Sequence, residues 1–389
     1  MNPILCDDKK NCCGCSACFS VCKFNAIKMK VDQEGFLYPT VDENECVHCN
    51  QCVKVCAFKR DQKKFSNGIT ESKCRAPVVY AVKHKDMDTR MNSRSGGIFT
   101  ALSDVVFEAE GVVYGCSITS DFMAVHMRAE NKEQRNLMRG SKYIQSDLKM
   151  TFSLAKQDLE MKRKVLFSGT SCQIAGLRSY LGKEYNNLFC IDIVCHGVPS
   201  PMVWKDYIGW QEKRAKGKCI AVDFRNKKDF GWATHIETLT FDNGKKTNSK
   251  VFKSLFYGHT ILRPSCYECP YKSVYHPGDI SIADYWGIDK AAPGFNDNKG
   301  VSLVLVNSEK GAQWFESVLS QIEYRKCRIE DSMQQSFIKP YAQPANRDEF
   351  WNDYYTRSFY LIARKYGNYG LVNSIREMLR QITSIINYV

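Results

Sequence analysis

Residues 12–22 read Cys-Cys-Gly-Cys-Ser-Ala-Cys-Phe-Ser-Val-Cys, and residues 46–56 read Cys-Val-His-Cys-Asn-Gln-Cys-Val-Lys-Val-Cys. Each stretch holds four cysteines at the spacing C-x2-C-x2-C-x3-C. Three thiolates at this spacing wrap one corner of an iron–sulfur cubane, and the fourth reaches the cluster of the other motif. The repeat therefore predicts two [4Fe–4S] clusters, one held by Cys12, Cys15, Cys18 and Cys56 and the other by Cys46, Cys49, Cys52 and Cys22.

Zinc is the alternative for these cysteines, because structural zinc sites also use C-x2-C pairs. A zinc site, however, gives no reason for a crossed repeat of three cysteines plus one. Cys13 falls off the spacing and is interpreted as a bystander. Residues 1–60 resemble a bacterial two-cluster ferredoxin, although Lys23 and Ala57 stand where proline often follows the fourth cysteine.

The composition is that of a folded protein with more than one domain. The chain has 389 residues, 44% of them hydrophobic and 25% charged, and no apolar run approaches the roughly 18 residues of a membrane span. The first residues lack a signal peptide, so we expect a cytoplasmic protein.

The net charge of +13 favours an acidic partner such as a ferredoxin-like electron carrier. No nucleic-acid-binding motif is present, and nucleic acid is not expected as a partner.

Beyond residue 76, short apolar runs alternate with helical patterns. Strands are predicted at 77–83, 112–118, 164–168, 188–194, 220–224, 279–283 and 302–307, and helices at 98–111, 173–181 and 202–214. Thr238–Phe241, before Asp242-Asn243-Gly244, predicts a hairpin arm. The fold class is α+β: a ferredoxin-like domain at 1–60, a linker at 61–76, a larger mixed α/β domain at 77–345 and a C-terminal helical segment at 346–389.

Polar loops follow several of these strands. Ser93-Arg94-Ser95-Gly96-Gly97 precedes a helix, where free N–H groups bind phosphate, although such a pattern is more often a plain turn. Gly169–Gln173 and Cys195–Pro199 each end a strand, and Arg263–Pro270 adds a C-x2-C pair. A third cluster would use Cys172, Cys195, Cys266 and Cys269. Zinc at the C-x2-C pair, a buried or nucleophilic Cys172 and a purely structural His196 are the alternatives.

These loops, in this order, resemble the coenzyme F420 hydrogenase/dehydrogenase beta-subunit family. The matching stretches span most of residues 75–345, and they are 93–102, 139–143, 169–178, 192–200, 224–232, 263–269, 279–288 and 300–311. Ser171 stands where the family has proline in a Gly-Thr-Pro-Cys loop. The resemblance implies a flavoprotein with FAD or FMN beside an iron–sulfur cluster, as in enzymes similar to hydroxymethyl chlorophyll reductase and in deazaflavin-oxidising subunits.

The resemblance also implies residue roles. Ser95, Gly96 and Gly97 would bind the flavin phosphate; the other predicted flavin contacts are Ser141, Lys142, Tyr143, Gly169, Thr170 and Gln173. His196 is the candidate proton donor, because an unperturbed imidazole has a pKa of about 6.5. The expected function is transfer of electrons from a ferredoxin-like donor through the clusters to a flavin and on to an organic substrate. Some relatives are linked to surface-polysaccharide pathways.

The C-terminus carries apolar residues at helical spacing, namely Leu371, Ile375, Leu379, Ile382, Ile386 and Val389. A helix packed on the core or on a second copy of the chain is the first interpretation, and a peripheral membrane helix is the second. Two other functions stay open at this point: a non-catalytic electron-transfer subunit that serves a partner enzyme, and a zinc-dependent interaction protein.

Overall fold

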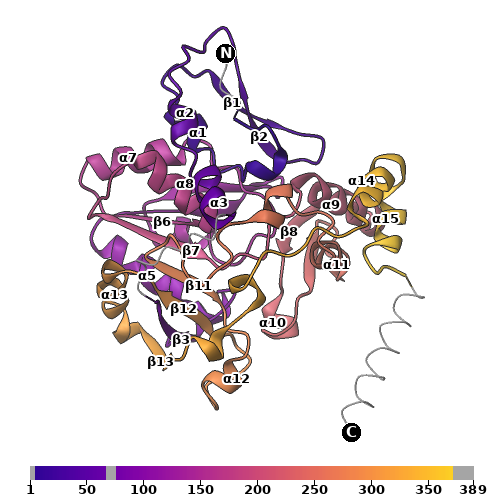
Figure 1. Ribbon diagram of the computed structural model, residues 1–389. Coiled ribbons are helices and arrows are strands. Elements are labelled where there is room, and N and C mark those ends of the chain that lie inside the picture. Colours follow the sequence, from indigo (N-terminus) through magenta and orange to yellow (C-terminus); the bar gives the residue numbers. More distant parts are fainter. Residues whose placement is uncertain (1–4, 67–75, 371–389) are drawn as a thin grey trace.

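The computed structural model describes residues 5–66 and 76–370. The N-terminal region projects from one side of a large sheet (Figure 1). It contains the hairpin β1 (Ile27–Val31) and β2 (Leu37–Val41), with η1 (Lys9–Asn11), α1 (Ala17–Val21), α2 (Gln51–Lys54) and α3 (Ala57–Ser66). Helices α1 and α2 both start after a left-handed residue, Ser16 at φ 60° and Asn50 at φ 56°. The two cysteine motifs therefore have the same local backbone form, as a duplicated motif requires.

Helix α3 covers the first part of the predicted linker. Residues 61–66 are helical, and α3 packs on α8 (Ser171–Leu181) of the following domain. The linker was predicted from polar composition, but its first residues continue a helix that begins at the second motif. The remainder of the predicted linker, 67–75, lies outside the described residues. The domain boundaries themselves stay predictions.

The centre of the molecule is a mixed eight-stranded sheet with the order β13-β3-β12-β11-β7-β6-β4-β5. Neighbouring strands from β11 through β7 and β6 to β4 run parallel, and the outer pairs are antiparallel. The strands are β3 (Val78–His84), β4 (Val112–Ile118), β5 (Ala124–Ala129), β6 (Val165–Thr170), β7 (Leu188–Ile193), β11 (Ile280–Asp284), β12 (Ser302–Val306) and β13 (Ile322–Cys327). The mixed α/β architecture is thus as predicted.

Two hydrophobic layers enclose this sheet. On one face α7 (Thr151–Glu160) and α8 cover Tyr114 and Phe167, and the N-terminal region adds Cys15 and Ala17 to the same layer. On the other face α5 (Ile98–Glu108) and α13 (Glu309–Glu316) cover the alternate side chains of the same strands. Strands buried on both faces are continuously apolar, which explains why the central strands could be located from sequence.

A separate three-stranded sheet and four helices pack together beside the large sheet. The antiparallel strands β8 (Cys219–Asp223), β9 (Glu237–Phe241) and β10 (Lys246–Ser249) contain the predicted hairpin. They share an aromatic core, centred on Trp204 and Phe252, with α9 (Pro201–Ala215), α11 (Val251–Tyr257), α14 (Arg347–Thr356) and α15 (Phe359–Lys365). The shorter elements are α4 (Met87–Met91), α6 (Lys132–Asn136), α10 (Lys227–Phe230), η2 (Pro264–Glu268), α12 (Ile288–Ala291), η3 (Leu319–Gln321), η4 (Glu330–Ser332) and η5 (Gln335–Phe337).

The predicted apolar stripe from Leu371 to Val389 lies outside the described residues. Within the described residues, none of the helices has the length and apolar character to cross a membrane.

Candidate redox site

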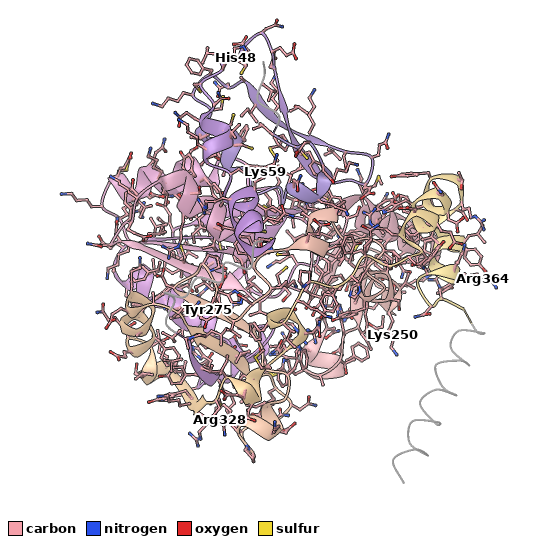
Figure 2. The ribbon with its side chains drawn as sticks, viewed as in Figure 1. His48, Lys59, Lys250, Tyr275, Arg328 and Arg364 are labelled. Atoms are coloured by element: carbon pink, nitrogen blue, oxygen red, sulfur yellow. The ribbon has the colours of Figure 1, made fainter. Side chains whose placement is uncertain are left out.

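The cysteines of the N-terminal region line two small cavities. One, of about 20 Å³, is lined by Cys22 of the first motif together with Cys46, Cys49 and Cys52 of the second. Burial raises the pKa of Cys52, and the neighbouring thiols of Cys49 and Cys22 raise it further. We call these four residues the outer set, because His48, beside Cys46, lies at the end of the N-terminal region remote from the sheet (Figure 2).

The other small cavity, of about 40 Å³, is lined by the remaining motif cysteines Cys12, Cys15, Cys18 and Cys56, and Cys52 of the outer set also reaches it. We call the first four of these cysteines the inner set. Lys59, three residues after Cys56, lies where the N-terminal region meets the large domain (Figure 2). Burial is the main cause that raises the pKa of Cys56 to about 11, and Cys15 and Cys12 add to it. The structure therefore places Cys56 beside Cys12 and Cys15, and Cys22 beside Cys52, while the crossed assignment of cluster ligands stays a prediction.

Two further cysteines lie beside the inner set: Cys6, which sequence reasoning missed, and Cys13, which it interpreted as a bystander. The thiol of Cys6 hydrogen-bonds to Cys12, and this contact lowers the pKa of Cys12. Cys13 lines both the inner cavity and a much larger cavity in the following domain, and its thiol interacts with Cys15 and Cys172. Neither residue fits the repeat, so no spacing signal could have pointed to them.

In the large domain, four thiols meet from three loops. Cys172 is in the first turn of α8, Cys195 follows β7, Cys266 lies in η2 and Cys269 caps it. Burial raises the pKa of Cys266 to about 12, with further contributions from Cys195 and Cys172. Burial also raises the pKa of Cys269, again with Cys172 and Cys266 as neighbours. The four residues that the sequence analysis grouped are thus close in space.

The chain topology explains this meeting. Strands β6 and β7 are parallel neighbours, so the loops after them, with Cys172 and Cys195, emerge at one edge of the sheet. The side chains of Thr170 and Gln173 cap the start of α8 reciprocally and hold Cys172 in its first turn. The buried Lys272 donates from Nζ to the carbonyl oxygens of Cys195 and His196, which ties the second loop to the chain after η2.

A cavity of about 910 Å³ opens beside these cysteines, within the size range of cofactor sites. Cys172 and Cys195 line it. Almost all of the predicted flavin contacts line it as well: Ser95, Gly97, Ser141, Lys142, Tyr143, Gly169, Thr170 and Gln173. Gly96 is not among the lining residues, because its N–H donates to Ser302 Oγ at 2.9 Å and a Cβ there would collide with the backbone of β3 and β12. Close packing against the neighbouring backbone therefore explains why position 96 is a glycine.

Lys142 is held by backbone within the cavity wall. Its Nζ donates to the carbonyl oxygens of Leu137, Arg139 and Gly140 at 3.1, 2.7 and 3.1 Å. Burial lowers the pKa of this amine to about 8. The side chain therefore organises the loop that follows α6 and brings positive charge to the cavity.

The reason given for His196 as a proton donor is wrong. The residue lines the cavity, but burial lowers the pKa of its imidazole to about 3, and the neighbouring His259 and Lys272 lower it further. His196 Nε2 lies 2.8 Å from His259 Nε2, and its ring stacks on Tyr341 at a centroid distance of 4.1 Å. A neutral imidazole at pH 7 supplies no imidazolium proton, although its N–H can still donate a hydrogen bond. A catalytic role of His196 stays a prediction.

The cavity wall has the charge that an anionic cofactor requires. Arg94, Arg139 and Arg225 all line it, and within the described residues each has at least one buried guanidinium nitrogen without a hydrogen-bond partner. Asp284, which accepts from Arg225 Nη1 at 2.8 Å, is the carboxylate among them. Helix α5 starts directly after Gly97 and presents its free N–H groups at the same wall. These features fit a phosphate-bearing group such as a flavin nucleotide.

The outer and inner sets each border a small enclosed volume. Among residues 5–66 and 76–370, no three His, Cys, Asp or Glu side chains converge on one point suited to a metal ion. A cubane is instead bound through separate iron atoms, each with its own thiolate, so its ligands surround a volume. Each of the two small cavities is such a volume, enclosed by cysteine side chains.

Comparison with known proteins identifies two domains. Residues 11–59 match the family model of a 4Fe-4S dicluster domain, and residues 162–332 match that of the C terminus of the coenzyme F420 hydrogenase/dehydrogenase beta subunit. Among solved structures, a chain of the F420-reducing [NiFe] hydrogenase complex from Methanosarcina barkeri matches with 18% sequence identity and a TM-score of 0.44, over 64% of this chain and 81% of that one. No curated protein matches the sequence. This chain therefore carries a stretch similar to a 4Fe–4S dicluster domain, followed by a longer stretch similar to the C terminus of the coenzyme F420 hydrogenase/dehydrogenase beta subunit.

Proposed function

We propose that the protein is an iron–sulfur flavoprotein oxidoreductase that takes electrons from a ferredoxin-like donor and passes them to an organic substrate. One observation carries this proposal: the predicted flavin contacts other than Gly96 and two cysteines of the large-domain set line the same cavity. Bound there, a flavin would accept single electrons and release them in pairs, which is the chemistry the cofactor supplies.

The residues of the chain have defined tasks in this proposal. The outer and inner sets each hold a [4Fe–4S] cluster, and Cys172, Cys195, Cys266 and Cys269 hold a third. Gly97 at the start of α5 and the cavity arginines bind the phosphates of FAD or FMN. Ser141 and Tyr143 contact the cofactor, and Tyr143 is held in place by Arg225 Nη1, 3.3 Å from its hydroxyl oxygen. The remaining space admits the substrate.

A non-catalytic electron-transfer subunit is the second candidate function, because the family domain takes its name from a beta subunit of hydrogenases and dehydrogenases. A subunit that only relays electrons needs its clusters close together but has no use for a cavity of about 910 Å³. The cavity therefore favours the enzyme. A role in surface-polysaccharide metabolism, residence in the cytoplasm and self-association remain further parts of the proposal.

Anaerobic purification of the full chain with quantification of iron, sulfide and flavin tests the proposal. Three cubanes and one flavin correspond to twelve irons and one flavin per chain. Protein with the irons but no flavin, and unable to bind added FAD or FMN, would support the electron-transfer subunit. Stoichiometric zinc without iron would overturn both functions.

A further inference from the structure

Arg263 is a buried cation whose charge has no carboxylate partner among the described residues. Its side chain belongs to the large domain and is 1% exposed. Nε donates to the carbonyl oxygen of Cys12 at 2.8 Å, and Nη2 donates to the carbonyl oxygen of Leu37 at 3.0 Å. Nη2 also lies 3.7 Å from Cys12 Sγ, and Nη1 is buried without a partner. The guanidinium therefore reaches from the large domain to a cysteine of the inner set.

The other buried arginines of the described residues are each neutralised. Arg90 pairs with Asp297 at 2.6 Å, Arg135 with Asp104 at 2.8 Å, Arg225 with Asp284 at 2.8 Å and Arg347 with Glu34 at 2.9 Å. An unpaired buried charge is costly, by several kcal/mol even after relaxation. Arg263 therefore needs an anionic partner other than a carboxylate.

The surroundings of Arg263 show where this anion is. Its guanidinium carbon lies 4.0 Å from the ring centroid of Tyr38 and 5.5 Å from that of Phe36, so two aromatic faces exclude water. The ionisable groups that act on it are the thiols of Cys12, Cys13 and Cys266 and the Tyr38 hydroxyl. Cys12 alone is in hydrogen-bond contact with it. A Cβ on Gly14, the residue after Cys13, would lie 3.1 Å from the guanidinium, so glycine leaves the room that Arg263 occupies.

We infer that Arg263 is the counter-cation of the inner cluster and raises its reduction potential above that of the outer cluster. This inference rests on the proposed cluster sets. A reduced cluster carries one more negative charge than an oxidised one, and a nearby desolvated cation stabilises the more negative state. Exposed charges near the outer set act through water and salt, and so have a weaker effect. Electrons that enter at the outer set are thereby drawn toward the large domain.

The test is an anaerobic redox titration of the full chain, followed by electron paramagnetic resonance. Arg263→Met removes the charge and keeps most of the side-chain volume. We expect the inner cluster of this variant to become at least tenfold harder to reduce, a negative shift of about 59 mV or more for a one-electron couple. The outer cluster should keep its potential, and Arg263→Lys should recover part of the shift. Cys22→Ser and Cys56→Ser assign the signals to the outer and inner sets.

Arg347 provides the matched control. It lies at the same junction, where Nη2 donates to the carbonyl oxygen of Leu262, and it pairs with Glu34 of the N-terminal region. Arg347→Met combined with Glu34→Gln removes a neighbouring buried ion pair without touching a cysteine, and it should leave both potentials unchanged. An equal shift in this control would show that loosening the junction is the cause and would overturn the inference.

Three further outcomes of these experiments also test the inference. Intact clusters with an unmoved inner potential in Arg263→Met would overturn the inference and leave the proposed function standing. Wild-type protein without iron would overturn the proposed function itself. If Arg263→Met cannot retain the inner cluster, the order of potentials in the wild type decides: the inference requires the inner cluster to be reduced first, and the opposite order contradicts it.

Discussion

Gly176, in the middle of α8, lies directly against Cys15 of the N-terminal region. A methyl group at Gly176 would stand 2.8 Å from Cys15 Sγ and 2.9 Å from its Cβ, closer than side chains tolerate. Cys15 in turn packs among the apolar residues of α7 and α8. The fit between the cysteine motif and the large domain thus depends on a glycine inside a helix, where glycine normally costs stability.

We expect Gly176→Ala to destabilise the protein by about 1–3 kcal/mol and to perturb the spectrum of the inner cluster, because Cys15 has to move. Gly209→Ala in α9 is the matched control, since a Cβ there would meet nothing within 4 Å. That change should stabilise the protein by up to about 1 kcal/mol. Denaturant unfolding and electron paramagnetic resonance measure the two effects; equal unfolding midpoints for both variants would contradict the argument.

The crossed ligand arrangement predicts the outcome of Cys22→Ser. Cys22 belongs to the first motif by sequence but lines the cavity of the second. The substitution should therefore weaken the cluster held by Cys46, Cys49 and Cys52, and the cluster of the inner set should persist. Cys219→Ser, a buried cysteine of the aromatic core, controls for general loss of a thiol. Loss of the inner cluster in Cys22→Ser would refute the crossed assignment.

If the large domain holds a third cluster, Cys269→Ser should remove it. We expect this variant to contain roughly four irons fewer than the wild type, the content of one cubane, with both N-terminal clusters retained. Iron analysis and electron paramagnetic resonance check the result. An unchanged iron content together with bound zinc would favour the alternative in which Cys266 and Cys269 hold zinc.

Two substitutions at Gly97 distinguish the effect of backbone strain on flavin binding from the effect of charge. Its φ of +93° is one that asparagine and aspartate tolerate better than other side chains, and both fill the same volume. Gly97→Asp should nearly abolish flavin binding, because it places a carboxylate where phosphate is expected, whereas Gly97→Asn should retain more of it. The flavin released on denaturation gives the occupancy. Equal occupancy in the two variants would argue against a phosphate at the start of α5.

Reduction by an acidic ferredoxin should slow as salt is added. The net charge of +13 attracts an acidic carrier over a Debye length of about 10 Å at 0.1 M ionic strength, and the attraction weakens as that length shrinks. Stopped-flow reduction at 0.05 and 0.5 M salt measures the effect on the second-order rate constant. A rate that is independent of salt would contradict electrostatic recruitment.

The sequence determined those features that depend on neighbours along the chain. The cysteine spacing by itself predicts the crossed sets, since a tight loop constrains where successive thiols can point. The central strands followed from their apolar runs, because strands buried on both faces have no polar positions to interrupt them. The start of α8 followed similarly, because Thr170 and Gln173 cap it locally. The grouping of the large-domain cysteines relied in part on a local rule, that parallel strands present their following loops, here those with Cys172 and Cys195, at one edge.

Only the tertiary structure decided what distant segments do to one another. Nothing near His196 in sequence shows that it stacks on Tyr341, or that burial, with His259 and Lys272 as neighbours, depresses its pKa to about 3. Nothing near Cys13 shows that it lies between Cys15 and Cys172, and nothing near Arg263 shows that it donates to Cys12, 251 residues away. Burial, desolvation and charge pairing depend on which surfaces meet when the N-terminal region packs on the sheet. Local sequence patterns carry no record of that contact, so these properties become visible only in the fold.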